Sequence, residues 1–396
     1  MKIPGTKQTI DRCDIDAVAA ALNGDYLTTG PGVAEFETAF AEATESRYAI
    51  AVNSGTAALH ASMFAAGIGE RSGGAATDEV IVPAISFVAT ANVALYQNAK
   101  PVFADLDPDT LLIDLADVER KITPRTKAII AMDYGGQPCD YIALRAIADR
   151  HGLLLVSDAC HSLGGRFQGR AVGSLADMSC FSLHPAKQIT TLEGGMVTTD
   201  DPDMVAKIRA FRNHGITTDH RQRQKKVTHR YSMESLGHNY RLSDVQCALG
   251  QSQLKRLSQF TAQRNLVALT YDQLLQDCEF VKPLRVLHNV SHARHLYVVH
   301  WDEGLAKCSR DDAFESLRRQ GIGANVHYRP IYDQPFYQRL IEDGTLATPQ
   351  CPVADFAYQA ILSLPIFPNM TDPQIHKVVN TMMTIADSVS VARNVA

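Results

Sequence analysis

The chain has 396 residues, of which 45% are hydrophobic and 20% are charged, and its formal net charge is −5. This balance excludes a general binder of nucleic acid or membrane surfaces, and no apolar run reaches the roughly 18 residues that predict a membrane span. Eight scattered cysteines without a C-x-x-C pair, and a first segment without an apolar signal sequence, predict a cytoplasmic enzyme with reduced thiols. The length predicts two domains in contact.

The N-terminal region predicts two helices joined by a turn-rich loop. Residues 8–23 show helical periodicity, with an apolar stripe made of Ile10, Ile15, Val18 and Leu22. Asn23-Gly24 is a helix-stop signal. The loop over residues 26–32 leads to a second helix from about residue 33 to residue 44.

Strands and helices then alternate along the chain. The predicted strands are 48–52, 79–83, 101–104, 127–132, 153–157 and 178–182. The predicted helices follow the turn at 53–56 and cover about 88–97, 114–121 and 140–150. This alternation, with β-branched strands, predicts an α/β fold with a mostly parallel sheet covered on both faces.

A basic stretch ends that alternation. Residues 217–231 carry five Lys or Arg and two His, and predict either a solvated loop or a lid that reaches an anionic substrate such as a diphosphate. Residues 242–277 predict a mainly helical region that leads into a second unit. Its predicted elements are strands near 295–301 and 322–327 and helices over 310–320 and 372–389. We therefore predict a large domain over 1–250 and a small C-terminal α/β domain over 251–396.

Lys187 is the only lysine between Lys127 and Lys207, and small, apolar and hydroxyl residues surround it. A desolvated lysine has a lowered pKa, which makes its amine available as a nucleophile or a base. Asp158 ends the apolar run 153–156, where an unpaired carboxylate is costly. An acid in that place can hold a protonated pyridine nitrogen. The pair suggests a pyridoxal phosphate (PLP) enzyme.

Three further positions have two interpretations each. The turn Asn53-Ser-Gly-Thr56 follows a strand and opens a helix, so it is either a phosphate site or an ordinary helix cap. Phe87 follows a strand, so it stacks on a flat ring or belongs to the core. His161 either faces the same cofactor as Asp158 or fills the first turn of a helix.

No metal site is predicted. His288, His292, His295 and His300 cluster in the sequence, but strand alternation over 296–301 would divide them between two faces. The chain also lacks the glycine-rich loops typical of ATP and dinucleotide sites.

Six motifs together resemble the sugar aminotransferases of the DegT/DnrJ/EryC1/StrS family. They occur in the family's order and span nearly the whole chain: Asn53-Ser-Gly-Thr-Ala-Ala-Leu59, Ile85-Ser-Phe-Val-Ala-Thr-Ala-Asn92, Ser157-Asp-Ala-Cys-His-Ser-Leu-Gly164, Phe181-Ser-Leu-His-Pro-Ala-Lys-Gln-Ile-Thr-Thr-Leu-Glu-Gly-Gly195, Gly237-His-Asn-Tyr-Arg-Leu-Ser-Asp244 and Val326-His-Tyr-Arg-Pro-Ile-Tyr332. The resemblance implies the aspartate aminotransferase-like fold (fold type I) and PLP as cofactor.

The resemblance also implies a role for each matching position. Lys187 would bind the cofactor as a Schiff base and then move the proton, and Asp158 would hold the pyridinium. His161 and Phe87 would lie against the ring. The phosphate would be held by Gly55, Thr56 and Ser182, and by Asn239 from a neighbouring subunit, in a homodimer with shared active sites. The sugar-nucleotide side would be lined by Asp25, Tyr26, Leu27 and Thr28 and by Asn325, Val326, His327 and Tyr328, together with Tyr337.

Within the family, Ile85–Asn92, the run from Lys187 to Thr191 and the run from Ser235 to Asn239 look most like PseC-type transaminases. Those enzymes use L-glutamate to aminate C4 of UDP-4-keto-6-deoxy-N-acetyl-β-L-altrosamine on the pseudaminic acid route. The alternatives are a UDP-4-keto-pentose, a dTDP-4-keto-6-deoxyhexose or, as a different reaction, sugar dehydration. Dehydratases of the family replace the lysine with histidine, so Lys187 counts against the last. The family's relatives often carry an aromatic residue near the start, where this chain has Gly5.

Overall fold

A computed structural model describes residues 2–218 and 220–393. In that part of the chain, a seven-stranded sheet has the order β1-β9-β8-β5-β4-β2-β3. Its strands are β1 (Tyr48–Val52), β2 (Glu79–Pro83), β3 (Lys100–Ala104), β4 (Thr126–Met132), β5 (Leu154–Asp158), β8 (Met178–Ser182) and β9 (Gly195–Thr199). Neighbouring strands from β3 to β8 are parallel, whereas β9 pairs antiparallel with both β8 and β1. The predicted α/β fold of the aspartate aminotransferase type is confirmed.

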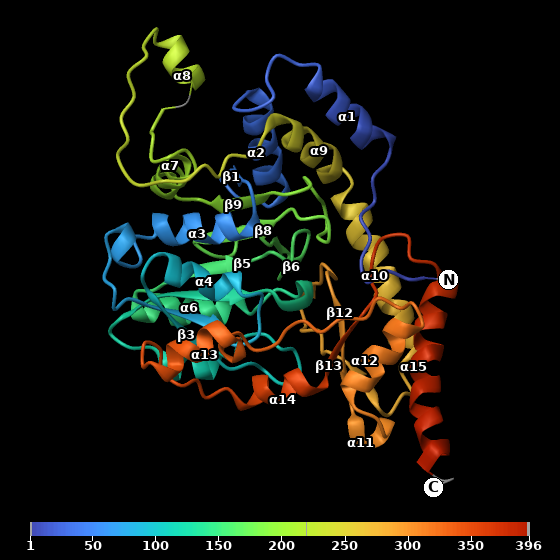
Figure 1. The fold of residues 1–396 in the computed structure, drawn as a ribbon. Coiled ribbons are helices and arrows are strands. Elements are labelled where there is room, and N and C mark those ends of the chain that lie inside the picture. The colour runs from blue at the N-terminus through green and yellow to red at the C-terminus, as the bar shows by residue number, and fades with distance from the viewer. Residues whose placement is uncertain (1, 219, 394–396) are drawn as a thin grey trace.

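Helices cover the sheet on both sides (Figure 1). They are α2 (Pro31–Ala43), α3 (Gly55–Ala65), α4 (Ala89–Tyr96), α5 (Leu115–Lys121), α6 (Tyr141–His151) and α7 (Pro202–Phe211). The strands contribute Val80–Val82 and Ile129–Ile130 to a core from which solvent is excluded. A parallel sheet buried on both faces needs apolar side chains on both, and this accounts for the near-continuous apolar strands.

The C-terminal part has its own core around a three-stranded antiparallel sheet, β10-β12-β13. Its strands are β10 (Val281–Pro283), β12 (Tyr297–Trp301) and β13 (Ile361–Leu364). The helices of this core are α10 (Leu257–Leu274), α11 (Glu303–Ala306), α12 (Arg310–Arg319) and α15 (Asp372–Arg393). The other late helices pack on the N-terminal part: α9 (Asp244–Leu254), α13 (Pro335–Glu342) and α14 (Pro352–Ala360). A small sheet joins β6 (Arg166–Phe167), β7 (Arg170–Ala171) and β11 (Val290–Ser291).

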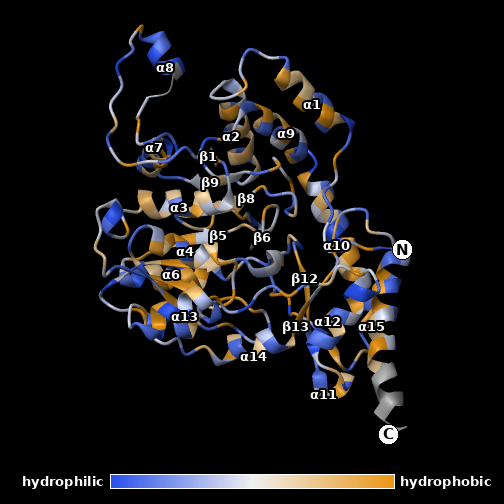
Figure 2. Cartoon of the chain, viewed as in Figure 1, coloured by the Kyte–Doolittle hydropathy of each residue, from blue (hydrophilic) through white to orange (hydrophobic). Residues whose placement is uncertain are grey.

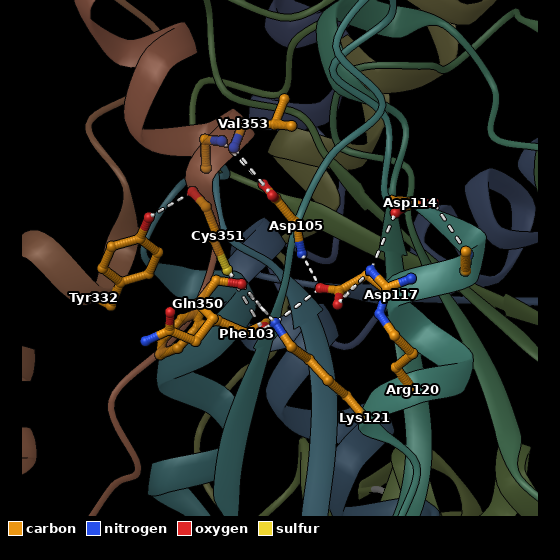
Figure 3. Close-up of polar contacts among 12 residues, drawn as sticks. Phe103, Asp105, Asp114, Asp117, Arg120, Lys121, Tyr332, Gln350, Cys351 and Val353 are labelled. Atoms are coloured by element: carbon orange, nitrogen blue, oxygen red, sulfur yellow. Dashed lines mark hydrogen bonds and ion pairs between the residues drawn. The ribbon is translucent and has the colours of Figure 1, made fainter.

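The segment that carries α13 and α14 returns to the large sheet (Figure 1). Asp105, just after β3, accepts hydrogen bonds from the backbone N–H groups of Val353 (3.0 Å) and Ala354 (2.9 Å) at the start of α14 (Figure 3). Lys121 donates to the carbonyl oxygens of Phe103 (2.6 Å) and Gln350 (3.3 Å). These bonds fix a late segment of the chain onto the early strand β3. The predicted boundary between two domains at residue 250 stays a prediction.

The basic stretch and the strand near 322–327 differ from expectation. Residues 217–231 contain a short helix, α8 (His220–Lys225), on an arm that projects from the body and is mostly blue in Figure 2. The segment 322–327 forms isolated bridges, from Ile322 to Ile3 and from Asn325 to Ser363, in place of a strand. Within the described residues, no helix is both long and apolar enough to cross a membrane.

The first helix, α1 (Arg12–Leu22), packs with the opposite face from the one predicted. Ile15 and Leu22 of the apolar stripe are 53% and 58% exposed. The buried face carries Asp14, which accepts hydrogen bonds from Ser252 and Gln253 of α9 and forms an ion pair with Arg256. The inward face of α1 is therefore joined to α9 and Arg256 by bonds to a buried carboxylate.

Candidate active site

Lys187 lies in the turn between β8 and β9, in the stretch from 183 to 194. The turn is closed by backbone bonds from Leu183 to Gly194 (2.8 Å) and from Lys187 to His184 (2.9 Å). Gly195 allows β9 to approach the turn at residue 54, because a Cβ there would come within 2.2 Å of the Ser54 carbonyl oxygen. Burial lowers the pKa of the Lys187 ammonium, an effect that Cys160 and Asp158 oppose. The lysine therefore suits the roles of nucleophile and proton carrier.

Asp158 ends β5 and is only 2% exposed. Its Oδ2 accepts a hydrogen bond from the Thr90 hydroxyl (2.6 Å), and its Oδ1 accepts one from the Cys160 N–H (3.2 Å). Thr90 in turn shares a hydrogen bond with Ser86 (2.6 Å). In the described residues, no lysine, arginine or histidine forms an ion pair with this carboxylate, although it interacts electrostatically with Lys187.

His161 lies three residues after Asp158 and is 1% exposed. Its Nε2 shares a hydrogen bond with the Tyr328 hydroxyl (3.2 Å), and its carbonyl accepts one from Gln188 (2.5 Å). Burial, with Lys187 and His327 nearby, holds the pKa of His161 well below its usual range. The ring is therefore neutral at pH 7. Phe87 lies on the other side of Tyr328, with ring centroids 6.2 Å apart, and is largely exposed.

The predicted phosphate turn forms the N-terminus of α3. Ser54 caps that helix by accepting from the Ala57 N–H (3.0 Å), which leaves the N–H groups of Gly55 and Thr56 at the open end. A Cβ on Gly55 would lie 2.8 Å from the Ser182 Cβ and 3.1 Å from the Cys160 Sγ. The structure therefore brings Gly55, Thr56 and Ser182 together, next to Asp158 and His161.

Asn239 lies beside the same turn within its own chain. The Asn53 side chain donates to the Asn239 carbonyl oxygen (3.4 Å), and the Asn53 N–H donates to the Tyr240 carbonyl oxygen (2.9 Å). Its contact with the phosphate of a neighbouring subunit stays a prediction.

The residues Asp158, His161 and Lys187 form one side of the site, which we call the cofactor wall. The segment 325–328, from the C-terminal part, contacts this wall through the hydrogen bond between Tyr328 and His161. His327 shares hydrogen bonds with Asn325 (3.1 Å) and Ser363 (2.9 Å), and its carbonyl accepts one from Tyr134. Burial, and then Lys187, lower the pKa of His327 to about 4. Val326 packs against the large core. Tyr328 and His327 thus join the cofactor wall to the side predicted for the sugar.

The segment Asp25–Thr28 is exposed and leads into α2. It is held by a bond from the Asp244 N–H to the Leu27 carbonyl oxygen (3.0 Å), by a bridge from Thr28 to Ser243, and by Arg221, which lies 5.7 Å from the Tyr26 ring centre. Among the described residues, no hydrogen bond, ion pair or ring contact joins this segment to Lys187 of the same chain. Its substrate role stays a prediction.

Tyr337 is buried in the large core, where its ring packs edge-on against Phe103. Its hydroxyl donates to the Asn92 side chain (2.7 Å). Its place on the substrate side stays a prediction.

Four residues of this wall are not singled out for it by the sequence: Thr90, Cys160, Gln188 and His295. Thr90, Cys160 and Gln188 lie inside the quoted motifs, and the spacing of Thr90 after the end of β2 is a signal that could have found it. In the sequence, His295 stands out only as a potential metal ligand. Its ring lies 4.2 Å from that of His161.

These residues fit PLP. The unpaired carboxylate of Asp158 suits a pyridinium, and the open end of α3 beside Gly55 and Ser182 suits a phosphate. The lowered pKa of Lys187 suits an amine that binds an aldehyde. The side chains are carried by three parallel-strand ends and two turns, which meet at one edge of the sheet.

The chain is similar over nearly its whole length to several known proteins. An uncharacterized protein of Methanocaldococcus jannaschii, MJ1066, is 36% identical over 97% of each chain. Helicobacter pylori PseC, described as an aminotransferase in the biosynthesis of pseudoaminic acid, is 34% identical with a TM-score of 0.89, over 98% of this chain and 100% of that one. The candidate sugar aminotransferase Spr1654 of Streptococcus pneumoniae, solved in its PLP form, is 27% identical with a TM-score of 0.88, over 98% and 100%.

Residues 8–383 match the family described as the DegT/DnrJ/EryC1/StrS aminotransferases. The predicted enzyme class and cofactor, a nucleotide-sugar aminotransferase that uses PLP, are confirmed by this match. The chain belongs to the DegT/DnrJ/EryC1/StrS aminotransferase family.

Proposed function

We propose that the chain transfers the amino group of L-glutamate to C4 of a UDP-4-keto-6-deoxy-N-acetylhexosamine, a step of the pseudaminic acid route. The observation that carries the reaction type is a desolvated Lys187 that interacts electrostatically with Asp158, a buried carboxylate that forms no ion pair among the described residues. The likeness to PseC over the full chain supports the choice of sugar.

PLP, when bound, supplies an electron sink that stabilises negative charge on the reacting carbon. Asp158 would keep a proton on the ring nitrogen, and Thr90 and the Cys160 N–H orient its carboxylate. Lys187 would take the proton from the substrate carbon at Nζ and return it at the neighbouring position. His161 and Tyr328 would close the wall against water. The Gly55–Thr56 turn and Ser182 would bind the phosphate.

Other nucleotide sugars are the nearest alternatives, namely a UDP-4-keto-pentose and a dTDP-4-keto-6-deoxyhexose. The exposed segment 25–28 and the arm with α8 are where such substrates would be told apart, because neither forms part of the cofactor wall. Sugar dehydration is disfavoured by the lysine at 187.

The reaction type is tested with purified protein and PLP. We expect a yellow protein that loses its visible absorbance when L-glutamate is added, while 2-oxoglutarate forms. Lys187→Ala should remove both signals, whereas Lys207→Ala, on α7, should keep them. A protein that stays colourless with PLP would refute the proposal.

The sugar is tested with a panel of UDP- and dTDP-4-keto sugars, scored by the amino sugar formed. We expect the UDP-N-acetylhexosamine to have the highest kcat/KM. Turnover of dTDP sugars alone would refute this assignment and leave the aminotransferase reaction intact.

A homodimer with shared active sites is part of the proposal. Large apolar side chains are exposed near the site and on the segment before Asn239, namely Leu192, Tyr231, Met233 and Leu236. Mixing inactive Lys187→Ala with an inactive Asn239 variant should restore activity, because one of the two sites would then have both residues. No rescue in a mixture shown to exchange subunits would refute shared sites. A cytoplasmic location, near the nucleotide-sugar pool, and the absence of nucleic-acid or membrane partners belong to the same proposal.

A further inference from the structure

Two histidine rings lie against each other behind the lysine turn. The ring centres of His161 and His295 are 4.2 Å apart, with 44° between the ring planes. His295 is 7% exposed and lies two residues before β12, in the C-terminal part of the chain. The pair is therefore a direct contact between that part and the wall that ends in Asp158.

The backbone behind His295 is held on two sides. Arg264, a buried arginine of α10, donates to the carbonyl oxygens of Arg294 (3.3 Å), His295 (3.5 Å) and Ile366 (3.1 Å). On the other side, a Cβ on Gly136 would lie 3.0 Å from the backbone nitrogens of residues 294 and 295. The backbone that carries the His295 ring is therefore held in place beside His161.

The surroundings of the pair favour uncharged rings. The charged or titratable groups that face His295 are basic: Lys187, Arg264, His161 and His327. The Nδ1 atoms of both rings are buried and have no hydrogen-bond partner in the part of the chain that the structure describes. A second proton on the Nδ1 atom of either ring would thus find no hydrogen-bond acceptor among the described residues, and burial lowers the pKa of both histidines.

His161 is consequently held from several directions. His295 lies against its ring, the Tyr328 hydroxyl meets its Nε2, and Gln188 binds its carbonyl. Two rings lie against the ring of His161: that of His295, with centres 4.2 Å apart, and that of Tyr328, stacked at 6.1 Å, so His295 gives the closer support to its plane. A ring that must lie flat against a cofactor needs such support, because rotation about its side-chain bonds would tilt it.

We propose that His295 is a positioning residue, whose uncharged ring holds the plane of His161 against the cofactor. The proposal rests on the proposed function, in which His161 contacts PLP. Its chemistry requires a flat, neutral group at position 295 and no hydrogen bond from that group.

The test compares four variants of the full-length protein, loaded with PLP. His295→Ala and His295→Gln remove the ring, and His295→Phe keeps a flat uncharged ring without nitrogen. His300→Ala is the matched control, since His300 is a half-buried histidine of β12 whose pKa is also lowered by burial. The measurements are the dissociation constant of PLP, the visible absorbance from pH 5.5 to 8.5, and kcat and KM for L-glutamate.

We expect His295→Ala and His295→Gln to weaken PLP binding roughly tenfold, the size of effect that supporting residues have on bound groups. Both should make the absorbance more dependent on pH, because the pKa of His161 rises when its ring gains water and loses a basic neighbour. They should lower kcat more than they change KM. His295→Phe should restore PLP affinity to within about twofold, and His300→Ala should match the wild type.

Two results would overturn the inference. Equal behaviour of His295→Ala and His300→Ala would show that the ring supports nothing, and equal impairment of His295→Phe and His295→Gln would show that the nitrogens matter. If His295→Ala does not fold, the comparison of His295→Phe with His295→Gln tests the inference. Wild-type protein that binds no PLP would defeat the proposed function and this inference together, whereas a PLP-binding wild type with unaffected variants would defeat this inference alone.

Discussion

The cofactor wall and the sugar side of the candidate site are built in different ways. Asp158, His161 and Lys187 lie at strand ends and turns of the large sheet, where buried side chains and backbone bonds fix them. The segment Asp25–Thr28 lies on the surface, between α1 and α2, and is held mainly by bonds to the start of α9. Substitutions in the cofactor wall disturb the core, whereas substitutions in the exposed segment Asp25–Thr28 do not.

This contrast separates two tasks of a transferase. A chemical step shared by many substrates needs fixed geometry, and strand ends in a sheet supply it. A choice among sugars needs surfaces that vary, and exposed segments supply those. Substitutions in the cofactor wall should therefore affect every substrate, and substitutions on the sugar side should change the preference among sugars.

The largest effect is expected from Asp158→Asn. A neutral amide cannot hold the charge of a protonated pyridine, so the rate of the half-reaction with L-glutamate should fall about 10²–10³-fold, as when one preorganised electrostatic contact is lost. Stopped-flow absorbance measures this rate without any sugar present. Asp149→Asn, at a carboxylate paired with Arg145 (3.0 Å) on the surface, is the control. A fall of less than about threefold would contradict the assignment.

Arg256→Met should affect stability and the sugar side together. Arg256 pairs with Asp11 (2.5 Å) and with the fully buried Asp14, so its loss leaves a buried charge with weaker partners and costs about 3 kcal/mol. Because α1 leads into residues 25–28, KM for the nucleotide sugar should rise while the glutamate half-reaction is unchanged. Urea unfolding and steady-state kinetics measure the two effects.

The control for Arg256 is Arg12→Met. Arg12 pairs with Asp16 on the exposed face of α1, and removing such a pair should cost about 0.5 kcal/mol or less. Equal losses in the two variants would show that Asp14 does not anchor the helix.

The histidines of the cofactor wall should make the protein less stable as the pH falls from 7 to 5. The pKa of His327 is lowered to about 4, and those of His161 and His295 are also lowered, mainly by burial. Below about pH 6.5 the unfolded chain binds protons that the folded chain does not, so protonation favours unfolding. Asp133, whose pKa burial raises to about 6, acts in the opposite direction over the same range.

Urea midpoints at pH 5, 6 and 7 measure this dependence. His295→Phe removes one of the three histidines and should reduce the slope. Because Asp133 acts in the opposite direction in both proteins, an equal slope in His295→Phe and the wild type would show that His295 does not stay neutral in the folded state.

The smallest effect is expected from Tyr26→Ala. The ring is exposed and contacts Arg221, a cation–π interaction worth about 0.5–1 kcal/mol at such a site. KM for the nucleotide sugar should rise several-fold, and the absorbance of the PLP-loaded protein should not change. Tyr358→Ala, which breaks a similar contact with Arg310, should leave KM unchanged. A changed absorbance in Tyr26→Ala would show that the sugar side and the cofactor wall do not act independently.

The sequence by itself determined most of the sheet strands and the chemical centre. The predicted strands 79–83 and 178–182 have the observed bounds of β2 and β8, and the sequence alone pairs Asp158 with Lys187. Apolar runs, turn residues and the isolation of one lysine are local signals, which do not depend on what lies next to them in space. Motif order then added the family and its cofactor.

Only the tertiary structure decided which distant segments meet. The sequence does not predict β9, because its antiparallel pairing depends on β8 and β1, which the residues of β9 do not specify. The apolar stripe of α1 faces solvent, against the prediction, and the opposite face carries Asp14, which pairs with Arg256. His295 faces His161 because β12 lies where two cores meet: its Val298 packs in the core that contains β5, and its Val299 packs in the C-terminal core. Local sequence patterns determine where helices and strands form, whereas the contacts between them depend on the free energy of the whole packed chain.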